Sequence, residues 1–175
     1  MIEYNEFEEH YFLDINWYFA DYYNRLCVVA SGGGVLPIFL LDKESRNNNF
    51  HEIVMDLEEQ FESRRNEDAI QNIIDYDPNL NIEQYFRDFE SLAKKGFYVY
   101  DKVDINDHND LRYVLVVYPI YDTRTDPYPI NPKDLQLIPK LNYGLISRTN
   151  SSFGKSNFTI RNLITLVNSK YRWRK

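Results

Sequence analysis

The sequence predicts one α+β domain over residues 1–175, built on a mainly antiparallel sheet with two or three helices packed on it. The chain has 175 residues and is 43% apolar, so it is long enough for one domain with a hydrophobic core. Short runs rich in aromatic and β-branched residues are typical of strands. Longer segments repeat apolar residues at intervals of three and four, which is typical of amphipathic helices. This mixture of elements favours the α+β class.

The strand candidates near the N-terminus are 10–23, 25–31 and 35–41. The first of them is expected to contain a turn near Asp14–Asn16. The first run is dense in aromatic residues, and the second is apolar and β-branched, as buried strands are. Gly32–Gly34 ends the second strand. Pro37 restricts the third run to a sheet edge or a strand start, because proline cannot donate to the ladder. The polar residues 42–49 are expected to form a loop.

A helix is expected at about 50–63, where apolar residues recur at helical spacing. Its apolar face consists of Phe50, Ile53, Val54, Leu57 and Phe61. The isoleucines of 70–74 either extend this helix or form a short element of their own. A turn is expected at Asp75–Asn79, because Pro78 disfavours helix at the residue before it.

The segment after this turn has signals for both ends of a helix. Asn81 suits the N-cap and Glu83 the first turn, whereas Lys94 and Lys95 suit the negative end of the helix dipole. Gly96 suits the position that ends a helix. The apolar stripe consists of Ile82, Tyr85, Phe86, Phe89, Leu92 and Ala93. The sequence therefore predicts a helix between Asn81 and Gly96.

The C-terminal half adds the strand candidates 97–100, 112–118 and 143–148. The polar segment 104–110 would join the first two as a long-looped hairpin. An irregular stretch follows, marked by Pro119, Pro127, Pro129, Pro132 and Pro139. It is expected to contain one short helix near 133–138. The last apolar segment, 160–167, is either a helix capped by Ser156 or Asn157 or a strand.

Charge is divided unevenly along the chain. Residues 1–110 contain 24 Asp and Glu against 9 Lys and Arg, a net charge of −15, whereas residues 111–175 have a net charge of +8. A segment of −15 attracts cationic partners and repels phosphate backbones, so nucleic acid is not expected as a partner. The basic C-terminal third leaves a nucleic-acid-associated protein as an alternative.

The sequence also bears on the compartment. No apolar run approaches the roughly 18 residues of a membrane span, so none is expected. The acidic residues 1–6 lack the basic and apolar regions of a signal peptide, so a cytoplasmic protein is expected. Cys27 is the single cysteine, which excludes an internal disulfide framework. Because it lies in an apolar run, it is expected to be a buried, inert thiol.

No pattern identifies a catalytic, metal or cofactor site, so the protein is expected to be non-enzymatic, with no cofactor. Gly32–Gly34 lacks the following Lys-Ser/Thr of a phosphate loop and predicts a backbone bend. The histidines lie far apart in the sequence, at His10, His51 and His108, without metal-ligand spacing. Residues 104–110 lack the Gly and Glu of an EF-type calcium loop.

Two enzyme alternatives stay open. A catalytic pair of Cys27 with a histidine is disfavoured by the apolar surroundings of the thiol. An enzyme of an unrecognised family would have its site near the Gly32–Gly34 bend. A deep pocket there that holds His or carboxylates would favour this alternative, and a filled core would count against it.

Two acidic clusters are candidates for binding a protein partner. The sequence leaves the oligomeric state open. The clusters consist of Asp75, Tyr76 and Asp77, and of Asp104, Asp107 and Asp110. Both are expected in loops, which often carry function. Carboxylates around an exposed tyrosine suit a cationic protein surface, with the ring as an anchor.

Two stretches carry a resemblance to other proteins. Residues 30–37 read ASGGGVLP, and residues 85–102 combine an aromatic helix with the ending AKKGFYVYDK. Together they resemble small uncharacterised bacterial proteins associated with interbacterial toxin–immunity loci. The two stretches comprise 26 of the 175 residues, and the resemblance identifies no catalytic residue. It implies an immunity protein that binds and occludes a cognate toxin, which would present a basic surface.

Overall fold

The computed structural model describes residues 14–21, 23–33, 36, 40, 44–76, 78–104, 106–107, 112–121, 128–140 and 158–159. The strands are β1 (Asn16–Ala20), β2 (Leu26–Ala30), β3 (Glu62–Arg65), β4 (Phe97–Lys102), β5 (Arg112–Ile120) and β6 (Phe158–Thr159). The helices are α3 (Glu44–Asp56), α4 (Glu67–Tyr76), α5 (Ile82–Lys94) and the 3-10 helix η1 (Asp134–Leu137). These elements confirm the α+β class.

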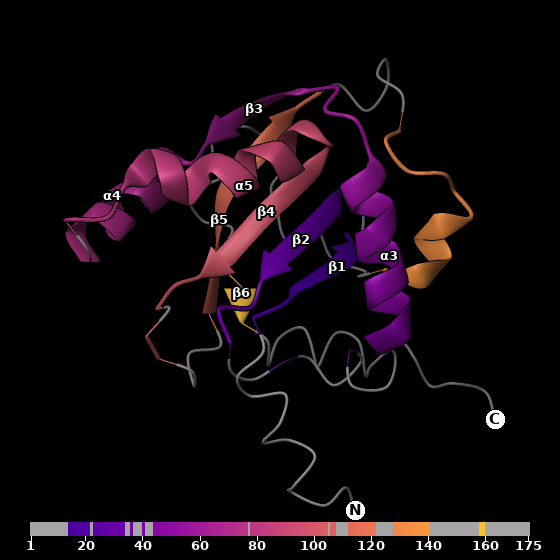
Figure 1. The fold of residues 1–175 in the computed structure, drawn as a ribbon, viewed down its shortest axis with the longest axis horizontal. Coiled ribbons are helices and arrows are strands. Elements are labelled where there is room, and N and C mark those ends of the chain that lie inside the picture. Colours follow the sequence, from indigo (N-terminus) through magenta and orange to yellow (C-terminus); the bar gives the residue numbers. More distant parts are fainter. Residues whose placement is uncertain are drawn as a thin grey trace, which may run out of the picture.

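The strands form one sheet in the order β1-β2-β4-β5-β3, with β6 paired to β5. Neighbouring strands are antiparallel apart from β2 and β4, which run parallel with Leu26 opposite Phe97 and Val29 opposite Tyr100. The predicted hairpin of β4 and β5 is confirmed. Figure 1 shows α3 lying over β1 and β2, and α5 over β4 and β5, on the same side of the sheet.

Each strand divides its side chains between two apolar layers, as the period of two requires. Under the helices, Tyr18, Val28 and Val99 pack with Phe50 of α3 and Phe86 of α5. The opposite face holds the aromatic cluster of Trp17, Phe19, Cys27, Val29, Tyr98, Tyr100, Tyr113 and Leu115, together with Leu36 and Leu40. This division places every pair of neighbouring β4 side chains on opposite sides of the sheet.

The helix between Asn81 and Gly96 is confirmed with both of its ends. The Asn81 side chain accepts the N–H of Gln84 at 3.1 Å. Gly96 has a φ of +98°, a left-handed value that glycine adopts without strain. A Cβ at this position would lie 2.7 Å from the Cγ of Pro129, so the close packing also excludes a side chain.

The first predicted helix is wrong at both ends. Instead of 50–63, α3 spans Glu44–Asp56, so the expected loop at 42–49 is helical from Glu44 onward. The inward stripe begins at a polar residue, Asn47, which is buried and donates from its side chain to the carbonyl of Asn16 at 2.9 Å. An apolar periodicity could not include it. At the other end, the buried Lys95 donates its Nζ to the last carbonyls of α3.

Several other elements differ from their predictions. Glu62 and Ser63, the last residues of the predicted helix, belong instead to the charged edge strand β3, which pairs with β5. The predicted turn at Asp75–Asn79 begins later, because α4 continues through Tyr76. Pro119 was assigned to an irregular stretch but lies in β5, opposite Ser63 of β3.

Other predictions are settled by single elements. The isoleucines of 70–74 belong to α4, an element of their own. Leu40 is helical, so the strand expected at 35–41 is wrong at this residue. The short helix near 133–138 is confirmed as η1. The strand candidate 143–148 and the segment 160–167 lie outside the described residues.

Candidate functional site

The residues predicted to bind a partner fall into three groups. Asp104 and Asp107 lie in the loop after β4, where the Asp104 carboxylate accepts the N–H of Asn106 at 3.0 Å and the Asp107 side chain is exposed. Asp75 and Tyr76 lie in the last turn of α4 rather than in a loop. Asp77 and Asp110 lie outside the described residues. The loop prediction is therefore wrong for Asp75 and Tyr76, because α4 persists up to the residue before Asp77.

A cavity of about 740 Å³ lies beside the glycine bend, between α3 and α5. It sits at the edge of the sheet where the parallel strands β2 and β4 end, an edge at which open sheets commonly bind ligands. Gly32 and Gly33 lie on one side, so the bend lines a pocket as well as redirecting the chain. Its polar lining includes the carboxylates of Asp14, Asp88 and Asp101.

Asp101 is the most deeply buried of these carboxylates. It lies in β4 and is 4% exposed. One oxygen accepts the hydroxyl of Tyr85, from α5, and the other accepts the backbone N–H of Lys102 at 2.8 Å. Burial raises its pKa from 3.8 to about 6, although both hydrogen bonds oppose the rise and the nearby charge of Asp14 adds to it. Asp101 can therefore change charge near neutral pH.

Asp14 connects the cavity to the glycine bend. Its Oδ1 accepts the N–H of Gly32 at 2.9 Å and the hydroxyl of Ser31 at 3.4 Å. Gly32 and Gly33 have φ values of +57° and +73°, left-handed values that glycine adopts without strain, so glycine suits both positions. From the other face of the sheet, the Lys102 Nζ donates to the Gly33 carbonyl at 2.8 Å. These contacts confirm the predicted bend and hold it in place.

His51 lines the cavity from α3. Its Nδ1 and the hydroxyl of Tyr18 share a hydrogen bond of 2.5 Å. Burial raises the pKa of Tyr18, so the phenol keeps its proton in this contact.

The cavity is acidic by composition. Among the described residues that line it there are three carboxylates and one histidine but no lysine or arginine. The part of the chain that the structure describes contains no group of three His, Cys, Asp or Glu arranged to hold a metal ion. The Lys102 side chain leaves on the opposite side of β4 from Asp101. A cationic group is the ligand that this lining favours, and phosphate is disfavoured.

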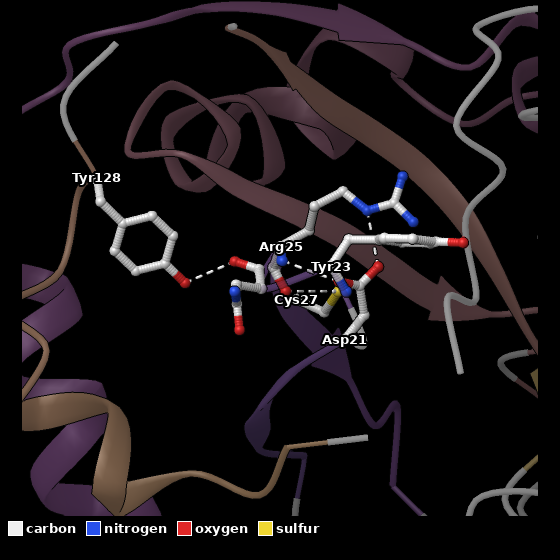
Figure 2. A network of polar contacts seen from close by, with 6 residues as sticks. Asp21, Tyr23, Arg25, Cys27 and Tyr128 are labelled. Atoms are coloured by element: carbon white, nitrogen blue, oxygen red, sulfur yellow. Dashed lines mark hydrogen bonds and ion pairs between the residues drawn. The ribbon is translucent and has the colours of Figure 1, made fainter. Parts of the chain in front are cut away.

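A second polar cluster lies at the turn between β1 and β2 (Figure 2). The fully buried Asp21 accepts the Nε of Arg25 at 2.7 Å and the N–H groups of Tyr23 and Arg25 at 2.8 Å. The guanidinium lies over the rings of Tyr23 and Tyr98, with its carbon 5.1 and 5.4 Å from their centroids. Because the ion pair is buried and enclosed by rings, it closes this turn.

Cys27 belongs to the same region and is fully buried, as predicted. Burial raises the pKa of its thiol well above the usual range. Cys27 packs in the aromatic cluster on one face of the sheet, whereas His51 contacts Tyr18 on the helix-covered face. The predicted alternative of a catalytic pair is therefore wrong for His51, the histidine that the described ranges include.

Comparison of the chain with protein-family models, curated proteins and solved structures gives no match. Within the described residues, every helix is too short or too polar to cross a bilayer.

Sequence analysis did not identify the cavity residues His51, Tyr85, Asp88 and Asp101 as a site. One local signal was present, since Asp101 follows a strand that the sequence already predicted. The parallel pairing of β2 with β4 was missing from the sequence reasoning, and this pairing brings the end of β4 beside the end of β2, where the cavity lies.

Proposed function

We propose that the protein is a non-enzymatic binding protein that occludes a protein partner with a basic surface. The instance we favour is a cytoplasmic immunity protein that blocks a cognate bacterial toxin. The observation that supports this proposal best is the acidic cavity, whose described lining has three carboxylates without a lysine or arginine. A basic surface would supply the missing positive charge.

The acidic loop after β4 extends this region. Asp101 lines the cavity, and Asp104 follows it by only three residues, within about 11 Å along the chain. Val103 donates its N–H to the carbonyl of Arg112 at 3.0 Å, which ties the base of the loop to β5. Asp107, on the same loop, is exposed. The cavity and the loop with Asp104 and Asp107 thus lie at the same end of β4.

This arrangement suggests a two-stage mechanism of occlusion. Exposed carboxylates such as Asp107 and Asp88 would first steer a basic surface toward the cavity end of the sheet. Half-buried rings there, Tyr85 and Phe89, would then exclude water from the contacts that form. A toxin that acts on nucleic acid has a basic active-site cleft, so a nuclease is the favoured target.

The proposal is tested by co-expression with the proteins encoded beside this one, followed by a tagged pull-down. A single stoichiometric partner that high salt releases is the expected result. With that partner, a variant that neutralises the predicted carboxylates should associate several-fold more slowly and with a flatter salt dependence. The positions are Asp75, Asp77, Asp104, Asp107 and Asp110.

A control variant with the same change in charge separates steering by this region from the effect of net charge. It neutralises exposed carboxylates outside the two predicted acidic clusters: Glu52, Asp56, Glu58, Glu62 and Asp68. Equal association rates for the two variants would contradict the steering mechanism. A clean protein without a partner would contradict the proposed function itself.

One specific observation favours an enzyme as the second candidate. The pocket that would favour this alternative is present beside Gly32, and it holds both His51 and a carboxyl group, Asp101, with a pKa of about 6. A carboxyl group that titrates near neutral pH suits general acid–base catalysis. Hydrolysis and isomerisation screens with wild-type protein and Asp101→Asn in parallel test it. Turnover that the variant loses would favour an enzyme over a binding protein.

A further inference from the structure

The cavity combines negative charge with flat apolar surface. Asp88 and Asp101 supply carboxylates from α5 and β4, whereas Tyr85 and Phe89 supply aromatic rings from α5. The two rings pack edge to face, with centroids 5.2 Å apart and an interplanar angle of 85°. Both rings therefore contribute aromatic surface to the cavity wall.

This chemistry discriminates among cations. A divalent metal ion needs several oxygen ligands converging on one point, and no such group exists among the described residues. An ammonium ion is compact and strongly hydrated, and it uses only the negative charge. A guanidinium group is planar and weakly hydrated; it can stack on an aromatic face and bind a carboxylate through two parallel hydrogen bonds.

The molecule already contains one guanidinium site of this kind. Arg65 donates to the carboxylates of Glu83 and Glu90 at 2.7 Å, and its guanidinium carbon lies 4.8 Å from the ring centroid of Phe86. The carboxylates and the ring of that site all come from α5. The cavity offers the same combination, with Asp88 and the rings of Tyr85 and Phe89 on the same helix.

The size and access of the cavity also fit a side chain. A volume of about 740 Å³ lies within the range of sites that take small organic ligands, roughly 300–1,000 Å³. Asp88 is exposed and Asp101 is buried, so carboxylates stand at two depths. A long side chain could meet the first on entry and the second at the inner wall.

We infer that the cavity between α3 and α5 is a binding site for a guanidinium group, supplied by an arginine side chain of the partner. The identity of the arginine's source rests on the proposed function, whereas the chemistry of the cavity does not. Free arginine derivatives therefore test the site without any partner.

The probe is N-acetyl-arginine amide, which is titrated into the ¹⁵N-labelled protein and followed by amide chemical shifts. N-acetyl-citrulline amide is the matched control, because it keeps the shape of the side chain and lacks its charge. The expected dissociation constant for arginine is on the order of 1 mM, as suits so small a ligand. Binding of the citrulline derivative should be at least tenfold weaker, and the shifts should cluster at Gly32, Gly33 and Asp101.

Two variants locate the site. Asp88→Asn removes a carboxylate of the cavity from an exposed position, so the fold should persist, and arginine binding should weaken at least threefold. Asp56→Asn makes the same change at an exposed position of α3 outside the lining and should leave binding unchanged. Equal effects of the two variants would show nonspecific attraction and overturn the inference.

Three other results would also overturn it. The first is no change in chemical shift at about 10 mM arginine derivative, roughly ten times the expected dissociation constant. The others are equally tight binding of the citrulline derivative or of N-acetyl-lysine amide. Failure of the proposed function has a different signature, because arginine would then bind while the pull-down yields no partner. Conversely, a captured partner that binds wild-type protein and Asp88→Asn equally, with no arginine binding, would overturn the inference alone.

Discussion

Asp101 makes the free energy of unfolding depend on pH in an unusual direction. Its pKa is about 6 in the folded protein against 3.8 for an ordinary aspartate. As the pH rises above about 4, the unfolded chain loses this proton first, so the folded protein binds more protons. Stability is therefore greatest when Asp101 is protonated, and it falls as the pH rises through about 6.

The size of the effect follows from the shift. A change of about two pKa units corresponds to about 3 kcal/mol, since each unit is worth about 1.4 kcal/mol. Most of the loss should occur between pH 4 and pH 6, the interval between the two pKa values. Asp101→Asn removes the titration but keeps the shape, and the amide oxygen can still accept the Lys102 N–H.

Urea denaturation of wild-type protein and Asp101→Asn at half-unit steps of pH measures the effect. The stability of the wild type relative to the variant should fall by about 3 kcal/mol from low to neutral pH. Asp107→Asn makes the same substitution at an exposed loop position outside the cavity and is the control. A flat or rising difference for Asp101→Asn would refute the argument that burial controls this carboxyl group.

Three further predictions concern packing. Gly96→Ala should destabilise the protein by at least ~1 kcal/mol in thermal or urea unfolding, because φ is +98° and the new Cβ would clash with Pro129; an unchanged midpoint would contradict this. Cys27 should resist an aromatic disulfide reagent in the folded protein, because the thiol is buried with a raised pKa. It should react at once in about 6 M guanidinium, which unfolds the protein; rapid labelling of the folded protein would contradict this. Lys95→Met should cost ~1–3 kcal/mol, because it leaves the last carbonyls of α3 without their buried donor; Lys94→Met, at a half-exposed neighbour, is the control and should cost less.

The parts of the fold that local chemistry controls were predictable. The cap at Asn81 and the stop at Gly96 depend on residues within a few positions of each helix end, so sequence reasoning found α5. Continuous runs of apolar, β-branched and aromatic side chains likewise identified β2, β4 and β5. In each case the information lies within the element itself.

The errors occur where a distant residue decides the structure. Glu62–Arg65 is charged and has no strand pattern, but Arg65 is held by Glu83 and Glu90 of α5 and by the ring of Phe86. Because these partners lie 18 to 25 positions away, no local window contains them. The start of α3 was missed for the same reason, since Asn47 is buried through a hydrogen bond to Asn16 of β1.

The candidate site shows the same limit more strongly, because its chemistry arises from burial rather than composition. Asp101 and Asp107 are both aspartates and lie six positions apart in one acidic segment. The parallel pairing of β2 and β4 and the packing of α5 place Asp101 under Tyr85, where desolvation raises its pKa, whereas Asp107 stays in solvent. The count of acidic residues predicts a cationic partner, but only the packing distinguishes the buried carboxylate from the exposed one. A guanidinium that enters the cavity should therefore lower the pKa of Asp101, and binding at pH 6 should release up to about half a proton per site, whereas binding by Asp101→Asn should release none.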